Sequence, residues 1–373
     1  MSTLRLREFK CIVSLSLAFI VANKELSFLN KGGFCMEKVC VLGAGSWGTA
    51  LAMVLAENGH DTLLWTHRTD QAEEINNLHT NRKYLPETIL PANLYATSDI
   101  AEAVAHSEII VVAVPTKAIR EVCEKMTAAL DKKVLFVHVS KGIEPDSLKR
   151  ISEILVESLP AEFVEEVVVL SGPSHAEEVV LHHPTTVTVA CADIEAAEKV
   201  QDLFMNQFFR VYTNEDVVGV EIGGALKNVI ALAAGITDGL NYGDNAKAAL
   251  ITRGLAEITR LGVKMGGNPF TFAGLTGMGD LIVTCTSVHS RNWRAGNLLG
   301  QGMKLPEVLD QMGMVVEGVR TTKAAYQLAE KYDVAMPIST ELYSVLFNDI
   351  EPKVAVDALM MRMKKREIDD MMH

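Results

Sequence analysis

Residues 39–58 read VCVLGAGSWGTALAMVLAEN, and this stretch decides the fold class. Residues 43–48, GAGSWG, match the pattern GxGxxG, with a short apolar run before them and a run that predicts a helix after them. The pattern alone is weak evidence, but this context is typical of a dinucleotide-binding loop. Gly43 permits a tight turn, Gly45 lets the backbone approach a pyrophosphate, and Gly48 lets the helix pack close to the strand. The N–H groups at the start of that helix favour an anion.

Further apolar runs follow along the first half of the chain. These runs are rich in Val and Ile, and their apolar residues are continuous rather than alternating with polar ones, as expected for strands covered on both faces. They lie at 62–66, 109–114, 134–139, 167–172 and 186–190. Between them the sequence predicts helices at 49–58, 117–130, 148–159 and 194–206. This alternation predicts an α/β domain over residues 36–216, with a parallel, doubly wound sheet of the Rossmann type.

The pattern changes near Asp216. Beyond it, Ala-, Leu- and Met-rich segments predict helices at 217–240, 246–265, 290–299, 321–331 and 354–365. We therefore expect an all-helical C-terminal domain over residues 217–373, which would carry the substrate site.

The composition excludes several classes of protein. Of the 373 residues 49% are hydrophobic and 22% are charged, which is typical of a globular protein. The net charge of −12 argues against a broad surface for nucleic acid or anionic membrane. The six cysteines form no CxxC pair, and no HExxH-like spacing occurs among the histidines, so we expect reduced thiols, no metal site and a cytoplasmic location.

The first 35 residues resemble a signal sequence. Arg5, Arg7 and Lys10 precede an apolar run from Cys11 to Ala22, which is short for a membrane span. We favour a dispensable extension, with the domain starting at Met36. A membrane-proximal anchor and a cleaved export signal are the alternatives.

Lys227 lies on a predicted helix among small and apolar residues. Gly223 and Gly224 precede it by one turn, and Ile230 and Ala231 follow it. Such a face approaches a ligand closely, and a partly desolvated lysine has a lowered pKa that suits proton transfer. The alternative is a lysine whose ammonium reaches solvent past apolar neighbours. Asn228 beside it can orient a polar partner.

Polar, glycine-rich clusters follow two strands and one helical segment. SKGIEP at 140–145 and SGPSHA at 171–176 come after strands, at the sheet edge where α/β proteins bind ligands. LTGMGDL at 275–281 and HSRN at 289–292 bracket a short link, and Arg291 there can bind a phosphate with its guanidinium. Each cluster alone is more often a loop than a site, but together they favour a site.

The second strand ends in Thr66-His67-Arg68, without the acidic residue that hydrogen-bonds the ribose of NAD. His67 and Arg68 can instead face a 2′-phosphate, so we expect a preference for NADPH over NADH. The alternative is that both are solvated loop residues.

Nine motifs occur in the order found in one family of dehydrogenases. They are GAGSWGTALA, VPTKAIR, SKGIE, SGPSHAEE, GVEIGGALKNVIALAAGI, ALITRGLAEI, LTGMGDLIVTCTS, HSRNWRAG and VVEGVRTT. From residue 38 to about 365 the chain thus resembles bacterial NAD(P)-dependent glycerol-3-phosphate dehydrogenases. The resemblance implies reversible reduction of dihydroxyacetone phosphate to sn-glycerol 3-phosphate, a precursor of glycerophospholipids, by a homodimer. It does not cover residues 1–35.

The resemblance, together with the glycines of the loop, implies the site residues. The predicted catalytic residues are Lys227, Lys141 and Asp280. The predicted cofactor contacts are Gly43, Gly45, Ser46, Trp47, Gly48, His67, Arg68, Tyr84, Lys141, Ala176, Arg291, Val315 and Glu317. The predicted substrate contacts are Lys141, Gly172, Ser174, Lys227, Asn228, Asp280, Ser290, Arg291 and Asn292.

The sequence leaves two alternative functions to consider. Another two-domain dehydrogenase, acting on a sugar phosphate or a keto acid, would differ in the HSRN and LTGMGDL motifs. A nucleotide sensor would bind the cofactor without turnover, and the presence of Lys141, Lys227 and Asp280 argues against it.

Overall fold

The structure is a computed structural model, and it describes residues 36–364, 366 and 367. The described residues from Lys38 onward form one compact unit. The predictions made for residues 1–35 lie outside the described residues.

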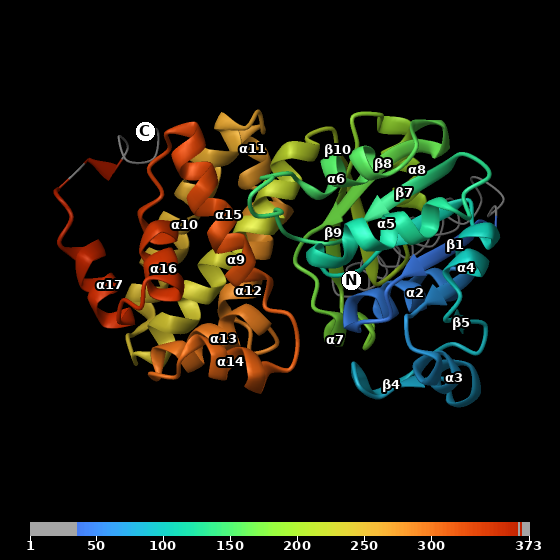
Figure 1. The fold of residues 1–373 in the computed structure, drawn as a ribbon, viewed down its shortest axis with the longest axis horizontal. Coiled ribbons are helices and arrows are strands. Elements are labelled where there is room, and N and C mark those ends of the chain that lie inside the picture. The colour runs from blue at the N-terminus through green and yellow to red at the C-terminus, as the bar shows by residue number, and fades with distance from the viewer. Residues whose placement is uncertain (1–35, 365, 368–373) are drawn as a thin grey trace, which may run out of the picture. The chain divides into compact units, whose positions relative to one another are not determined.

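The N-terminal half is built on an eight-stranded sheet (Figure 1). In spatial order the strands are β10 (Phe209–Asn214), β9 (Thr185–Ala190), β8 (Val164–Ser171), β7 (Val134–His138), β6 (Ile109–Val112), β1 (Lys38–Leu42), β2 (Asp61–Trp65) and β5 (Tyr95–Thr97). The strand order reverses at β1: β2 and then β5 lie on one side of it, and the next strand of the sheet, β6, lies on its other side. This is the topology of a doubly wound sheet, whose ligands bind where the order reverses.

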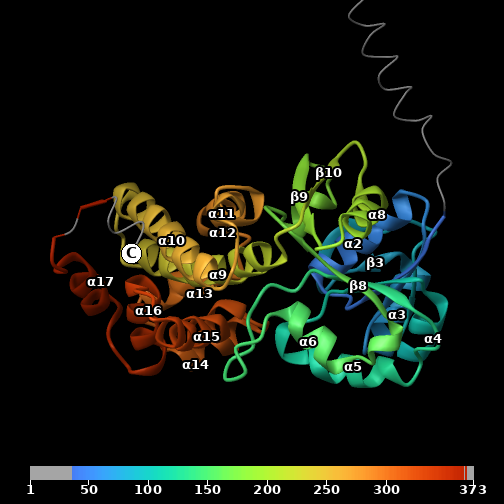
Figure 2. The same cartoon turned by 90° about the horizontal axis from the view of Figure 1, so that it is seen from above.

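Helices cover both faces of this sheet (Figure 2). On β1, Val39 and Val41 point to one core and Cys40 and Leu42 to the other, which explains the continuous apolar run. The first core includes α2 (Ser46–Glu57), α3 (Thr69–Leu78), α7 (Ala176–Val179) and α8 (Ile194–Phe204). The second includes α4 (Ile100–His106), α5 (Ile119–Thr127) and α6 (Ile151–Ser158).

The structure adds elements that the sequence analysis missed. β5 has three residues, β10 alternates buried and exposed positions with Arg210 outward, and β3 (Thr80–Asn81) with β4 (Leu85–Ile89) forms a separate hairpin. The predicted parallel, doubly wound sheet is confirmed except at one strand pair, because β8 and β9 pair antiparallel. Only the four-residue helix α7 lies between them, so the chain turns back without the long crossover that a parallel pair needs.

The described part of the chain beyond Asn214 is helical. Its helices are α9 (Val217–Gly239), α10 (Asp244–Lys264), α11 (Pro269–Phe272), α12 (Asp280–Thr286), α13 (Arg291–Gly300), α14 (Leu305–Met312), α15 (Glu317–Tyr332), α16 (Pro337–Phe347) and α17 (Pro352–Met360). A π-helical turn, Leu275–Gly279, precedes α12. Four of these helices were not predicted from the sequence: α11, α12, α14 and α16.

Helix α9 is the core of this region. It is long and apolar enough to cross a membrane, but 83% of its most apolar window is buried inside the protein. Glycines let α13 lie against it: a Cβ on Gly235 would come within 2.0 Å of the Trp293 carbonyl oxygen, and one on Gly296 within 2.0 Å of that of Leu232. Close packing of α13 against α9 thus explains the many small residues of α9. Lys227 is one of the buried residues of this helix.

Candidate active site

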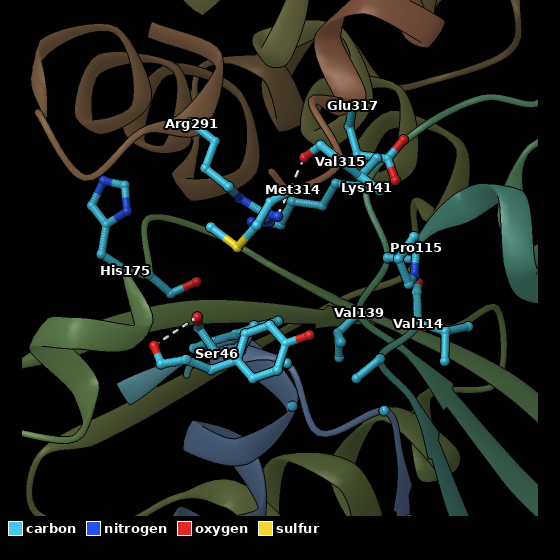
Figure 3. Close-up of a pocket in the computed structure, with 18 of the residues that line it drawn as sticks. Ser46, Val114, Pro115, Val139, Lys141, His175, Arg291, Met314, Val315 and Glu317 are labelled. Atoms are coloured by element: carbon cyan, nitrogen blue, oxygen red, sulfur yellow. Dashed lines mark hydrogen bonds between the residues drawn. The ribbon is translucent and has the colours of Figure 1, made fainter. Parts of the chain in front are cut away.

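A cavity of about 490 Å³ lies between the carboxyl edge of the sheet and the helical region. Its lining comes from the glycine loop before α2 and the residues after β2, β6, β7 and β8. The helical region contributes α9, α12, α13 and the start of α15. Figure 3 shows Ser46 and Val139 on the sheet side and Arg291 and Glu317 on the helical side.

The glycine loop has the shape that a dinucleotide requires. Gly43 has a φ of +119°, and a Cβ there would lie 2.8 Å from the Ala113 carbonyl oxygen. A Cβ on Gly48 would lie 1.9 Å from the carbonyl oxygen of Gly43. A Cβ on Gly45 would meet no atom of the described residues within 4 Å, so this backbone is open to the cavity at the start of α2. The loop therefore fits a pyrophosphate held by backbone N–H groups.

Two lysines share one buried carboxylate at the inner end of the cavity. Lys141 Nζ donates to Asp280 Oδ2 over 2.6 Å, and Lys227 Nζ donates to Asp280 Oδ1. Lys227 also donates to Thr284 Oγ1 over 2.8 Å, and Lys141 to the Gly172 carbonyl oxygen over 3.0 Å. The Lys227 residue is 7% exposed and Asp280 1%. Two positive charges and one negative charge leave this cluster with a net positive charge.

Burial and the neighbouring charges shift the pKa values of Lys227 and Asp280. Burial lowers the pKa of Lys227 to about 8, although the Asp280 carboxylate opposes the shift, and the ammonium of Lys141 adds to it. Burial alone would raise the pKa of Asp280, but the two ammonium groups outweigh it and hold that pKa below its usual range. Lys227 can therefore exchange a proton near neutral pH beside a carboxylate that stays ionised.

A pair of amides connects α9 with α13 and α15. Asn292 Nδ2 donates to Asn228 Oδ1 over 2.8 Å, and the Gly318 N–H donates to Asn292 Oδ1 over 2.9 Å. Asn228 Nδ2 reaches the Lys141 carbonyl oxygen at 3.4 Å. These bonds tie the Lys141 loop to the helix that carries Lys227.

Arg291 opens helix α13 on the far side of the cavity. Ser290 caps this helix, since its Oγ accepts the Trp293 N–H over 3.2 Å. The Arg291 guanidinium donates to the Val315 carbonyl oxygen over 3.3 Å, as Figure 3 shows. A guanidinium at a helix start is suited to an anionic group such as a phosphate.

Glu317 connects the start of α15 to the sheet side. Its Oε1 accepts the Thr116 N–H over 3.1 Å, and Oε2 has no hydrogen-bond partner among the described residues. Burial raises the pKa of this carboxyl despite those contacts. A buried oxygen that lines the cavity and lacks a partner fits a polar group of a bound cofactor.

The end of β2 differs from the expected geometry. His67 lines the cavity, but the Arg68 side chain is turned to Asp70. Arg68 Nε donates to Asp70 Oδ1 over 3.0 Å, and Arg68 Nη2 donates to Asp70 Oδ2. Arg68 is not among the lining residues. Lys83 does line this end of the cavity and lies over the Tyr84 ring, and the Tyr84 carbonyl oxygen accepts from Ser46 Oγ over 3.1 Å.

Most of the predicted site residues border this one cavity. They are Gly43, Gly45, Ser46, Trp47, Gly48, His67, Tyr84, Lys141, Ser174, Lys227, Asn228, Asp280, Ser290, Arg291, Asn292, Val315 and Glu317. Arg68, Gly172 and Ala176 do not line it, although Gly172 accepts from Lys141. The geometry brings these residues together, and their individual roles stay predictions.

Sequence reasoning missed several lining residues. Lys83, Pro115, His175, Thr284 and Met314 border the cavity as well. Thr284 could have been found, because it is one helical turn from Asp280 and so shares its face. No sequence signal distinguishes Lys83 from other surface lysines.

Both halves of the chain match models of one family. Residues 38–197 match the N-terminal part of NAD-dependent glycerol-3-phosphate dehydrogenase, and residues 216–357 match its C-terminal part. The chain belongs to the NAD-dependent glycerol-3-phosphate dehydrogenase family.

Individual relatives agree with this assignment. A glycerol-3-phosphate dehydrogenase [NAD(P)+] of Lysinibacillus sphaericus is 90% identical over 338 residues, which are 91% of this chain and 100% of that protein. The Bacillus subtilis enzyme of the same name is 66% identical over 91% of this chain and 98% of its own length. The crystal structure of glycerol-3-phosphate dehydrogenase from Coxiella burnetii has a TM-score of 0.83 at 38% identity, and covers 87% of this chain and 99% of that one.

Proposed function

We propose that this protein reduces dihydroxyacetone phosphate reversibly to sn-glycerol 3-phosphate, with NADPH or NADH as the hydride donor. The observation that carries the proposal is the Lys141–Asp280–Lys227 cluster in the same cavity as the glycine loop and Arg291. Relatives that are 66–90% identical carry the name of this enzyme.

Lys227 supplies the proton for the reduced carbonyl. As the ketone carbon is reduced, negative charge develops on its oxygen, and a nearby ammonium stabilises that charge and then transfers a proton. Lys141 adds positive potential, and Asp280 holds both ammonium groups at hydrogen-bonding distance of one carboxylate. In the reverse direction Lys227 acts as a neutral base, which its lowered pKa allows.

Arg291 and its neighbours hold the phosphate away from the reacting carbon. Ser290 and Asn292 flank Arg291 at the start of α13, opposite the sheet. Anchoring the phosphate there fixes the orientation of the ketone and removes much of the entropic cost of reaction.

The glycine loop, Ser46 and Glu317 would hold the dinucleotide. Backbone N–H groups at Gly45 and the start of α2 suit its pyrophosphate, and the partnerless Glu317 oxygen suits a polar group of it. The nicotinamide supplies the hydride when it is bound.

We also propose a preference for NADPH. The end of β2 carries no acid, and His67 and Lys83 supply basic groups on the cavity wall. We expect Arg68 to contribute less to binding the 2′-phosphate of NADPH, because its guanidinium is paired with Asp70.

We further propose a cytoplasmic location, a homodimer and a domain boundary after residue 216. The boundary is supported by the end of β10 at Asn214 and the start of α9 at Val217.

The direct experiment compares ketones in the purified enzyme. Consumption of NADPH and NADH is measured with dihydroxyacetone phosphate, unphosphorylated dihydroxyacetone and a keto acid. We expect rapid turnover with the phosphorylated ketone alone. Turnover with the keto acid instead would assign the chain to another dehydrogenase activity, and cofactor binding without turnover would favour a sensor.

A further inference from the structure

His175 is a cavity residue whose role the proposed mechanism leaves open. It lies directly before α7 and lines the cavity together with Ser174, Lys227 and Arg291. Figure 3 shows its ring reaching from the start of α7 toward the helical region that carries Arg291. Its Nε2 is buried and has no hydrogen-bond partner among the residues that the structure describes. A buried nitrogen of this kind is costly unless a ligand or a water satisfies it.

The state of the ring makes Nε2 an acceptor. Burial lowers the pKa of His175, and the ammonium of Lys227 lowers it further, while Glu177, a hydrogen bond with the Val283 backbone and Glu178 oppose the shift. A neutral imidazole carries one hydrogen and one lone pair, so Nε2 is an acceptor when the hydrogen is on Nδ1. The remaining lone pair, on Nε2, can accept one hydrogen bond. Another titratable neighbour is His289, whose ring centre lies 5.9 Å away.

Several side-chain acceptors near Lys227 already have partners. The two Asp280 oxygens accept from Lys141 and Lys227, and the side-chain oxygens of Asn228 and Asn292 accept from Asn292 and Gly318. Their hydrogen bonds maintain the cluster itself. His175 Nε2 is an acceptor on this wall that the protein's own described groups leave open.

The substrate of the proposed function contains one group that needs such an acceptor. Its phosphate requires cations and its carbonyl oxygen requires a donor, which Arg291 and Lys227 supply. The hydroxyl of the hydroxymethyl group, on the other side of the carbonyl from the phosphate, is a donor and has been given no partner.

We propose that His175 is a substrate-binding residue whose Nε2 accepts a hydrogen bond from the hydroxymethyl group of dihydroxyacetone phosphate, and so selects hydroxy ketones over deoxy ketones. The inference rests on the proposed function. We expect the enzyme to discriminate between the two kinds of ketone, because a site that pairs a substrate hydroxyl binds an analogue without that hydroxyl less well.

The test compares two ketones in one enzyme. kcat/KM is measured for dihydroxyacetone phosphate and for hydroxyacetone phosphate, which has a methyl group in place of the hydroxymethyl group. The ratio of the two values does not depend on the fraction of correctly folded enzyme. In wild type we expect the ratio to favour the hydroxy ketone by about tenfold or more, the range for an unsatisfied polar group. In His175→Phe it should fall toward one, mainly through the loss of activity with the hydroxy ketone.

Two further variants separate the hydrogen bond from the presence of a ring. His175→Gln, whose amide oxygen can take the place of Nε2, should restore a substantial part of the ratio. His289→Phe replaces the neighbouring imidazole and should change both ketones by the same factor. Equal losses for both ketones in His175→Phe, or an unchanged ratio, would overturn the proposal. If wild type reduced neither ketone, the proposed function would fail instead.

Discussion

At the scale of single residues, Lys227 depends on its burial and on Asp280. The ammonium of a residue that is only 7% exposed would be unstable without a counter-charge, and Asp280 supplies it while leaving the pKa of Lys227 at about 8. This balance makes the lysine an acid for ketone reduction and a base for alcohol oxidation.

Replacing Lys227 with alanine should lower kcat by a factor on the order of a hundred or more, the usual contribution of a positioned proton donor. Dinucleotide affinity, measured by titration of cofactor fluorescence, should change little. Near-normal turnover in Lys227→Ala would remove this residue from the mechanism.

The pH dependence follows from the same pKa. Reduction needs the ammonium form, so its rate should fall as the pH rises through about 8. Oxidation needs the neutral amine and should rise over the same range. Parallel pH profiles in the two directions would contradict the assignment of Lys227 as the group that transfers the proton.

Arg291 should read the phosphate. Arg291→Ala removes a charge-assisted contact worth about 1.5–3 kcal/mol, or roughly 10- to 100-fold in kcat/KM, for dihydroxyacetone phosphate. Reaction with unphosphorylated dihydroxyacetone should be affected much less. The idea fails if the two ketones lose activity by equal factors.

The preference for NADPH over NADH depends on the basic residues near the end of β2. We expect wild type to prefer NADPH and to lose part of that preference at high salt, because the basic groups are accessible to solvent. Arg68→Asp should shift the kcat/KM ratio toward NADH. Lys83→Ser provides a comparison, because Lys83 lines the cavity whereas Arg68 is paired with Asp70. A preference for NADH in wild type would show that cofactor choice is made elsewhere.

At the scale of elements, Glu221 holds α9 against the sheet domain. Its Oε2 accepts from Arg150 Nη1 over 2.5 Å and from Ser152 Oγ over 2.6 Å, and its Oε1 accepts the Ser152 N–H over 2.9 Å. His138 Nε2, at the end of β7, lies 3.1 Å from Oε1. Burial alone would raise the pKa of Glu221, but His138, Arg150 and Ser152 bring it down to about 2. One carboxylate thus joins the helix of Lys227 to the strand that precedes Lys141.

Glu221→Gln should therefore destabilise the protein by about 3 kcal/mol, because it leaves Arg150 without its buried partner. Urea unfolding at neutral pH measures the loss. Since the folded-state pKa is depressed, the stabilisation by Glu221 is present above about pH 4.5 and is lost as the pH falls toward 2. The difference between wild type and variant should shrink over that range, and a difference that stays constant would exclude the charge as its cause.

The elements also show what the sequence could predict. The six strands with continuous apolar runs are strands in the structure, because burial on both faces leaves a clear pattern. The edge strands β5 and β10 were missed since one of their sides is exposed, and α12 was missed because a π-helical turn interrupts its pattern. At the site, motifs predicted the lysines and Asp280, whereas the turning of Arg68 to Asp70 depends on side-chain geometry that no motif encodes.

At the scale of the whole molecule, the described residues from Lys38 onward form one compact unit that contains the cavity and every residue of the proposed mechanism. A protein that starts at Met36 should fold, stay in solution and keep full activity. Specific activity and thermal unfolding of the shortened and full-length proteins test this expectation. An inactive shortened enzyme, or a full-length protein that purifies with membranes, would show that residues 1–35 are needed.

The most direct test of the proposed mechanism is reduction of dihydroxyacetone phosphate by the purified protein with NADPH, with the product identified by chirality. We predict sn-glycerol 3-phosphate in an amount equal to the NADPH consumed, and almost none from Lys227→Ala at equal protein concentration. An active wild-type enzyme whose Lys227→Ala variant forms the same product at the same rate, or a wild type that consumes NADPH without forming sn-glycerol 3-phosphate, would contradict it.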